Sequence, residues 1–385
     1  MIAVVLMGGH SKGTRFRPLS LNSPKPFFRV GGHSIPEWII KSTKFDKIYF
    51  MGFYTPEEVQ EPLKKLSIKY SMKMEYLMEP EGLGTAGGLL HFQHTILQEN
   101  PQQICLLHSD VLCSFPIDDM IKCHESSLIT ILTTQVQESV SNRFGCLVIQ
   151  DNKLMHYAEK PESYISNWIN GGIYIISPKL FKLLPQYQED EITSPTASPL
   201  KKQGFKKLSL ERTVLPQLSG SGTATVYKYD GYWAQLKTAN SAIALNTLAL
   251  HTFNVDKPTQ NIIMPCAIHP TAQISPTAKI GPNVSIGPNV YVGDGVRIRD
   301  AIIAEQTHID PFACIMHSVV GKNSFIGKWA RVEGSPLREI EIVFGNIKAS
   351  NLVGTKIPIS DENNYVVNGV KQQSATILGR TNSYS

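Results

Sequence analysis

Short apolar runs separated by longer mixed segments fill the first 250 residues. Eight of these runs predict strands, and the first, at residues 1–7, is apolar throughout. Such a run is typical of a strand buried on both faces, as in a parallel sheet. Thr55 followed by Glu58 predicts the capped start of a helix. Strands that alternate with helices predict an α/β fold with a mostly parallel sheet. The other predicted strands cover residues 47–53, 74–78, 103–110, 128–134, 146–150, 172–176 and 224–229.

From residue 266 the apolar pattern changes to a period of six residues. Turn sequences such as His-Pro-Thr-Ala and Gly-Pro-Asn-Val separate the apolar positions. A six-residue period with Gly, Pro and Asn turns predicts a parallel β-helix, in which one branched residue per side points inward. Antiparallel hairpins would not give five consecutive six-residue steps. The repeat positions, with two one-residue slips, are Ile268, Ile274, Ile280, Ile286, Val292, Ile298, Ile303, Ile309, Ile315, Val320, Ile326 and Val332.

These two patterns divide the chain. We expect an α/β domain over residues 1–250, a linker over 251–264, the β-helix over 265–335 and a partly irregular extension over 336–385. Residues 180–210 show no periodicity and contain Ser-Pro-Thr-Ala-Ser-Pro, which predicts a solvated surface loop without function.

Composition narrows the class of partner. The net charge of +5 is mild for 385 residues and no basic run occurs, so neither nucleic acid nor a membrane surface is an expected partner. No apolar stretch has membrane-spanning length, and the N-terminus lacks a signal peptide's basic region. The six cysteines are scattered without metal-binding spacing, which indicates free thiols and a cytoplasmic protein.

The first strand leads into a loop that is rich in glycine and cations. Gly8, Gly9 and Gly13 are followed by Arg15 and Lys25. Glycine lets backbone N–H groups approach a phosphate, and a buried strand feeding such a loop is typical of nucleotide binding. The spacing matches neither a Walker A loop nor G-x-G-x-x-G. The alternative is an ordinary surface loop with solvated charges.

The motifs of the chain, taken in order, carry a resemblance. They are G-G-x-x-x-G-T-R-x-R-P-L-S, P-K-P, G-L-G-T-A-G-G, S-D-V, E-K-P and N-G-G-I-Y, followed by the hexapeptide repeat. This order resembles the sugar-phosphate nucleotidyltransferases, and among them the mannose-1-phosphate guanylyltransferase (GDP-mannose pyrophosphorylase) family. The resemblance implies a Rossmann-like nucleotidyltransferase domain followed by a left-handed parallel β-helix of hexapeptide repeats. The loop from Gly9 to Arg15 is two residues longer than in catalytic chains, which is similar to alpha-type subunits.

The resemblance also implies a reaction and residue roles. GTP and mannose 1-phosphate would give GDP-mannose and diphosphate. Arg15 would hold the β- and γ-phosphates and Lys25 the α-phosphate, because two polyanions must approach each other. Asp110, at the end of a predicted strand, would hold Mg²⁺. The base and ribose would be lined by Leu6, Gly8, Gly9, Gly13, Thr14, Gly84, Thr85 and Ala86, and the sugar by Gly145, Glu159, Lys160 and Asn170.

Each assignment has a structural alternative. On that alternative Asp110 caps a turn, Glu159 and Lys160 form an exposed ion pair, and Gly145 and Asn170 are turn residues. Three isolated histidines have no partner nearby in the sequence, and we expect them to be structural. They are His108, His308 and His317.

One departure from the family pattern bears on catalysis. Catalytic members carry a second metal-binding Asp in a G-x-W-x-D context, and the matching position here is Gln235. A carboxamide brings no charge, so Mg²⁺ binding would be weak or absent. With the alpha-type loop, this favours a regulatory subunit that binds GDP-mannose and forms a hetero-oligomer with a catalytic beta-type homologue. Two alternatives stay open, namely an active enzyme with a single-carboxylate magnesium site and a non-binding structural scaffold.

Overall fold

The computed structural model describes residues 1–8, 13–17, 19–20, 23–187, 207–253 and 261–334, and the backbone of four short strands beyond them. The chain forms two compact units. The first comprises Met1–Lys12, Pro36–Trp233 and Ile342–Lys348. The second comprises Gly13–Ile35, Ala234–Glu341 and Ala349–Ser385. Among the described residues no helix is long and apolar enough to cross a membrane.

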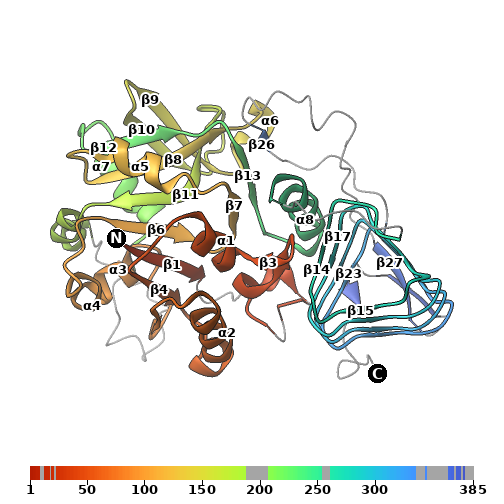
Figure 1. The fold of residues 1–385 in the computed structure, drawn as a ribbon. Helices are drawn as coiled ribbons and strands as arrows, with labels where there is room; N and C mark the ends of the chain where they lie inside the picture. Colours follow the sequence, from red (N-terminus) through yellow and green to blue (C-terminus); the bar gives the residue numbers. More distant parts are fainter. Residues whose placement is uncertain are drawn as a thin grey trace, which may run out of the picture. The chain divides into compact units, whose positions relative to one another are not determined.

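A nine-stranded sheet with flanking helices forms the first unit (Figure 1). The strand order is β5-β4-β1-β6-β11-β8-β12-β10-β9. Strands β5, β4, β1 and β6 are parallel, as are β8 and β12, whereas β11 runs antiparallel to both β6 and β8. The strands are β1 Ile2–Gly8, β4 Lys47–Gly52, β5 Met74–Met78, β6 Ile104–His108, β8 Ile129–Gln135, β9 Gly145–Gln150, β10 Lys153–Glu159, β11 Trp168–Ile176 and β12 Ala224–Lys228.

Burial explains why these strands could be predicted. Ala3 and Val4 of β1 are fully buried because β1 has a neighbour on each side and packed layers on both faces. The helix predicted at Thr55 is α2, and its capping box with Glu58 is present. All eight predicted strands are confirmed. The helices of this unit are α2 Pro56–Tyr70, α3 Gly87–His91, α4 Gln93–Leu97, α5 Ile117–His124, α6 Glu138–Ser141 and α7 Leu215–Leu218; α1 Ile35–Ser42 begins at its boundary.

The interpretation of residues 180–210 as a solvated loop is wrong at both ends. Leu180 and Leu184 are fully buried in two short 3₁₀-helices, Pro178–Lys182 and Leu184–Tyr187. Leu208 and Leu210 are also buried, and a π-helix begins at Leu210. Apolar residues at irregular spacing supply these contacts, so periodicity could not reveal them. Residues 188–206 lie outside the described residues.

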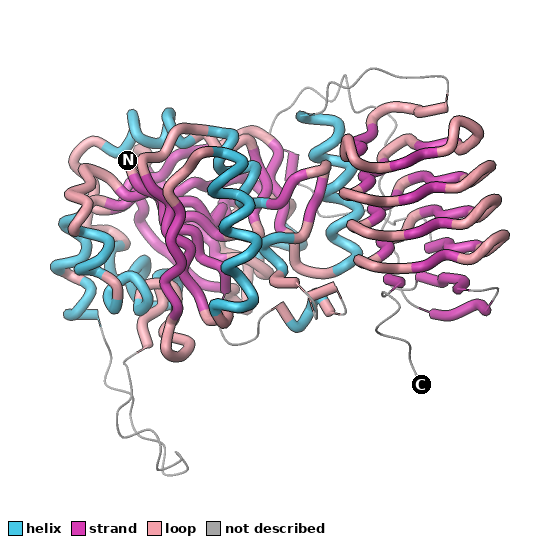
Figure 2. The backbone as a smooth tube through the Cα atoms, turned by 60° about the horizontal axis from the view of Figure 1, so that its bottom comes forward, coloured by secondary structure: helices cyan, strands magenta, loops and turns pink. Residues whose placement is uncertain are grey.

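Three parallel sheets wind into a β-helix in the second unit, and its coils stack like rungs in Figure 2. Each coil contributes one short strand to each sheet, so Val284 lies beside Cys266 and Ala301 beside Val284. The predicted repeat is confirmed. Its positions are buried from Ile280 onward, and Ile268 and Ile274 of the first coil are half-buried. The strands are β14 Cys266–Ile268, β15 Gln273–Ile274, β16 Lys279–Ile280, β17 Val284–Ile286, β18 Tyr291–Val292, β19 Arg297–Arg299, β20 Ala301–Ile303, β21 His308–Ile309, β22 Cys314–Met316, β23 Val319–Val320, β24 Phe325–Ile326 and β25 Arg331–Gly334.

Later strands return to the last coil. β29 (Thr376–Ile377) pairs in parallel with β23, and β27 (Asn363–Val367) pairs antiparallel with β25 and with β28 (Val370–Gln373). These C-terminal strands therefore extend two of the three sheets. Residues 346–354, whose sequence also favours a strand and a turn, lie outside the described residues.

A buried asparagine joins three parts of the second unit. Asn246 lies on α8 (Ala239–Phe253) and is fully buried. Its Oδ1 accepts hydrogen bonds from Gly31 N (2.9 Å) and from Ser285 Oγ (2.6 Å), and its Nδ2 donates to Asn283 O (3.2 Å). One side chain thus fixes α8 to the β-helix and to the turn between β2 (Arg29–Val30) and β3 (His33–Ser34).

Candidate functional site

Two strand ends meet at one edge of the first unit's sheet. Leu6 of β1 lies beside His108 of β6, and Ser109 N donates to Leu6 O at 3.0 Å. Asp110 follows directly and is half-buried. The carboxyl ends of parallel strands are where α/β sheets bind ligands. The Gly8 end of β1 and Asp110 therefore lie at the same edge of the sheet.

A chain of polar side chains lies on the neighbouring strands. Tyr157 OH donates to Glu159 Oε2 at 3.0 Å, and Asn170 Nδ2 lies 3.1 Å from Tyr157 OH and 2.8 Å from Tyr174 OH. Tyr174 OH in turn donates to Glu211 Oε1 at 3.4 Å. Two of the residues assigned to the sugar, Glu159 and Asn170, therefore belong to one hydrogen-bonded network.

Gly145 supports this network by being small. It lies beside Glu159 in the β9–β10 pair, and a Cβ there would overlap Tyr157 OH and lie 2.8 Å from Glu159 Oε2. The glycine thus leaves room for these side chains. Lys160, the fourth residue assigned to the sugar, is exposed and its Nζ lies 3.4 Å from Glu159 Oε1.

Glu211 and His108 complete the network, and sequence reasoning missed both. His108 Nε2 lies 3.3 Å from Glu211 Oε1 in a pair whose side chains are 24% and 13% exposed. Burial disfavours charge on each, but the pairing outweighs it: the pKa of His108 is raised and that of Glu211 is lowered well below its ordinary range. His108 has no partner nearby in the sequence, as expected, and the fold brings the distant Glu211 beside it.

A second glycine-rich loop, residues 82–88, contacts the segment that carries Glu211. It is called the nucleotide loop below, because Thr85 in it was assigned to the nucleotide. Leu208 O accepts hydrogen bonds from Ala86 N (3.0 Å) and Gly87 N (2.9 Å), and a Cβ on Gly84 would lie 2.6 Å from that oxygen. Gly84 also has φ +84°, which only glycine adopts readily. In the described structure the close approach that these glycines permit is made by the Leu208 backbone.

Thr85 is the link between the loop and Glu211. Its hydroxyl donates to Glu211 Oε2 at 2.6 Å and accepts from Leu210 N at 2.8 Å. Thr85 was assigned to the nucleotide, so one hydrogen bond joins a residue of the nucleotide loop to the network that holds Glu159 and Asn170.

From Gly13 onward the cationic loop belongs to the second unit. Gly13 has φ +71°, and the exposed Thr14 and Arg15 lie on a 3₁₀ turn, Thr14–Phe16, in which Phe16 is buried. Lys25 Nζ donates to Leu236 O at 2.9 Å, next to Gln235 at the end of β13 (Tyr232–Gln235). Gly9, the remaining residue assigned to the nucleotide, lies outside the described residues.

The residues that the family resemblance assigns to Mg²⁺ include one carboxylate, Asp110 at the end of β6, because the other, Gln235, is uncharged. Within the described ranges no three His, Cys, Asp or Glu side chains cluster as metal ligands would. We therefore derive no catalytic step through a metal ion.

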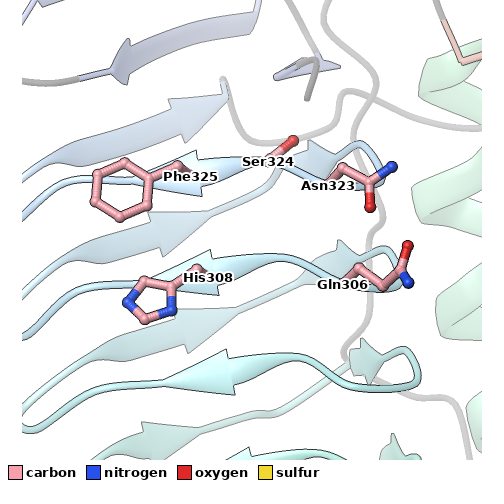
Figure 3. A pocket seen from close by; sticks show the side chains of 5 residues that line it. All are labelled: Gln306, His308, Asn323, Ser324 and Phe325. Carbon is pink, nitrogen blue, oxygen red and sulfur yellow. The ribbon is translucent and has the colours of Figure 1, made fainter. Parts of the chain in front are cut away.

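The β-helix also carries a pocket, of about 280 Å³ (Figure 3). Gln306, His308, Asn323, Ser324 and Phe325 line it. The His308 ring stacks on Phe325 at 5.4 Å, and its Nε2 lies 3.0 Å from Asp310 Oδ1. No Lys or Arg lines this pocket, so it lacks the charge that nucleotide phosphates require.

Comparisons with known proteins agree with this architecture. The family model described as Nucleotidyl transferase matches residues 2–242, and the model described as GMPPB C-terminal domain matches residues 262–381. A putative glucose-1-phosphate thymidylyltransferase from Bacillus anthracis, solved with a sucrose, has the same fold at a TM-score of 0.53 and 18% identity, covering 68% of this chain and 98% of that one. The fold and the matching model place the chain in the nucleotidyl transferase family.

Curated relatives narrow the family. The mannose-1-phosphate guanylyltransferase regulatory subunit alpha of Dictyostelium discoideum is 42% identical, covering 87% of this chain and 86% of that protein. The Rattus norvegicus protein of the same name is 39% identical, covering 87% and 84%. A probable mannose-1-phosphate guanyltransferase of Schizosaccharomyces pombe is 36% identical, covering 98% and 91%. The chain belongs to the mannose-1-phosphate guanylyltransferase family, among its alpha-type members, as the motif order predicted.

Proposed function

We propose that the protein is the regulatory alpha-type subunit of a mannose-1-phosphate guanylyltransferase, which binds GDP-mannose and modulates a catalytic beta-type homologue in a hetero-oligomer. The observation that carries this proposal is Gln235, which stands where catalytic members have their second metal-binding Asp. The names of the Dictyostelium and rat relatives support it.

The proposed roles of the residues follow the family resemblance and the contacts of each. Exposed Arg15 and half-buried Lys25 would bind phosphate oxygens, Arg15 through its planar fork and Lys25 as a point charge. Glu159 and Asn170 would exchange hydrogen bonds with sugar hydroxyls, with Gly145 and Lys160 beside them. The nucleotide would contact Leu6, Gly8, Gly9, Gly13, Thr14, Gly84, Thr85 and Ala86.

Magnesium has a smaller proposed role than in a catalytic chain. Nucleotidyl transferases generally use Mg²⁺, and Asp110 would be its one protein carboxylate here. When bound, the ion would neutralise diphosphate charge. We also propose a cytoplasmic location, which the six free cysteines support, because free thiols persist in a reducing compartment.

The test is binding together with turnover on the purified chain. Calorimetric titration is expected to show specific GDP-mannose binding, while an assay of diphosphate release from GTP and mannose 1-phosphate shows none. Gln235→Asp restores the missing carboxylate and is expected to give measurable, Mg²⁺-dependent turnover. Robust synthesis of GDP-mannose by the unaltered chain would contradict the proposal.

The Asp110→Ala variant tests the alternative of an active enzyme, and GDP-mannose binding tests the alternative of a structural scaffold. An active enzyme with a single-carboxylate site would lose its activity on Asp110→Ala, whereas a regulatory subunit has no activity to lose. A non-binding scaffold would give no heat with GDP-mannose. Adding a catalytic beta-type homologue completes the test, because a regulatory subunit is expected to co-elute with it and to change its dependence on GDP-mannose concentration.

A further inference from the structure

Glu211 touches both halves of the candidate site in the first unit. One carboxylate oxygen, Oε2, accepts from the Thr85 hydroxyl on the nucleotide loop. The other, Oε1, accepts from Tyr174 and faces His108, and thereby joins the side chains assigned to the sugar. We propose that Glu211 is a positioning residue that couples the nucleotide loop to the sugar side, so that the sugar is held well only when the loop is in place.

The loop side of this connection is rigid. Leu208 N donates to Leu83 O at 2.9 Å, and Leu208 O accepts from Ala86 and Gly87. Three backbone hydrogen bonds thus hold the segment to the loop before the Thr85 side chain adds its own contacts. Ser209 Oγ donates to the same Glu211 oxygen at 3.2 Å. The Thr85 and Ser209 hydroxyls, together with the backbone hydrogen bonds of the loop, therefore fix the orientation of the Glu211 carboxylate.

The sugar side depends on that orientation. Tyr174 donates to Glu211, so its oxygen is left to accept from Asn170 Nδ2 at 2.8 Å. Asn170 Oδ1 accepts from Gly172 N at 3.0 Å, which fixes the amide. If the Glu211 carboxylate turned, Tyr174 and then Asn170 would lose defined partners, and the loss would reach Glu159 through Tyr157.

Charge makes Glu211 the point on which the network depends. A carboxylate is the strongest acceptor available to Thr85 and Tyr174, and it also fixes the ring of His108 two residues before Asp110. The residue deepens the proposed function, on which this inference rests, by linking two sets of residues that the family resemblance treats separately.

The experiment changes a residue of the nucleotide loop and measures how much the sugar contributes to binding. Thr85→Val keeps the shape of the side chain but removes the hydroxyl that orients Glu211. Thr134→Val is the control, since Thr134 is a threonine of the same unit, more buried than the half-buried Thr85, and its Oγ1 has no hydrogen-bond partner among the described residues. Titration with GDP-mannose and with GDP gives, for each protein, the ratio of the two affinities, which reports the sugar's contribution.

We expect Thr85→Val and Glu211→Gln each to lower the GDP-mannose-to-GDP affinity ratio about ten-fold, the size expected for losing one charge-assisted hydrogen bond. The double variant is expected to fall no further than the single ones, because both changes break the same connection. Thr134→Val is expected to leave the ratio unchanged.

Other outcomes overturn the inference. If Thr85→Val and Glu211→Gln weaken GDP and GDP-mannose equally, or lower only the melting temperature, Glu211 is merely structural and couples nothing. Additive losses in the double variant would show two independent contacts. If the unaltered protein binds no GDP-mannose, the proposed function fails instead, so the two failures are distinguishable.

Discussion

Single buried polar residues mark the places where this sequence was hardest to interpret. Glu211 and His108 form a pair that no local pattern announces, because the two residues lie far apart in the chain and each has an unremarkable neighbourhood. Asp110, Glu159 and Asn170 were predicted as site residues because they stand in motifs of the family resemblance. A motif identifies a residue from its neighbours in the sequence, whereas an ion pair between distant segments cannot be recognised in either segment alone.

Glu79 is a second buried carboxyl, and it gives a pH prediction. It is 6% exposed, and burial raises its pKa to about 7, although a backbone hydrogen bond from Leu83 acts in the opposite direction. The folded pKa is above the unfolded one, so the stability that Glu79 contributes is full below the unfolded pKa and is lost as pH rises through about 7.

Glu79→Gln is therefore expected to be more stable than the unaltered protein at pH 8, by roughly 3 kcal/mol at most, with the difference vanishing below about pH 4. Urea unfolding at several pH values measures it. Glu61→Gln, at an exposed carboxylate on α2, removes the same charge and should change little. A pH-independent difference between Glu79→Gln and the unaltered protein would contradict the assignment.

Asn246 gives a prediction on stability alone. Asn246→Ala leaves Gly31 N, Ser285 Oγ and Asn283 O without this partner, and is expected to cost about 3 kcal/mol of unfolding free energy. Ser285→Ala breaks one of the three bonds and should cost about 1 kcal/mol. Chemical denaturation of both variants checks the gradation, and equal costs would count against it.

At the scale of elements, regular patterns were reliable and irregular contacts were not. Continuous apolar runs such as β1 and β6 were predicted because burial on both faces leaves little choice of residue. The segment around Leu208 was misinterpreted because its role is to pack its own backbone against the loop at Gly84, and backbone contacts are nearly independent of side-chain identity. Gly84 was the one residue in the sequence that indicated a close backbone contact, and a glycine there is equally expected beside a nucleotide.

Gly84→Ala tests this packing. A Cβ there would lie 2.6 Å from Leu208 O, and the residue would keep a positive φ, so the variant is expected to lose about 2–4 kcal/mol of stability. Gly222→Ala is the control, since Gly222 has φ +74° with nothing near its Cβ position. That variant should lose about 1 kcal/mol from the backbone alone. Equal losses in thermal unfolding would exclude the contact with Leu208.

The β-helix allows a comparison between coils. Ile315 is fully buried between coils, and Ile315→Ala is expected to cost about 3 kcal/mol, the usual cost of a core cavity. Ile274 in the first coil is half-buried, and Ile274→Ala should cost about 1 kcal/mol. Denaturant unfolding of the two variants measures the difference. Equal costs would mean that position in the stack is unimportant.

For the whole molecule, the sequence predicted two kinds of architecture because each has its own pattern, apolar runs alternating with mixed segments before residue 250 and a six-residue period after residue 266. The return of β29 to β23 was not predicted, since pairing between distant segments has no period. The assignment to the family rested on several motifs in order, and the comparisons bear it out over most of the chain.

Ligand binding offers a prediction on the intact chain. If GDP-mannose binds the folded protein and not the unfolded one, a concentration one hundred times the dissociation constant is expected to stabilise it by about 2.7 kcal/mol. Calorimetric melting at increasing GDP-mannose concentration measures this, with free mannose as the control. An unchanged melting temperature at saturating GDP-mannose would contradict binding.

The stacked rings at one corner of the β-helix have a spectroscopic consequence. Trp329 adopts φ +63°, stacks on Phe312 at 4.5 Å and is 69% exposed. The chain's other tryptophans, Trp38, Trp168 and Trp233, all lie in the first unit. Most of the red-shifted emission that acrylamide quenches readily should therefore come from Trp329, since Trp168 is half-buried, and the most blue-shifted emission from the fully buried Trp233. Native fluorescence can thus follow each unit separately, without an added label.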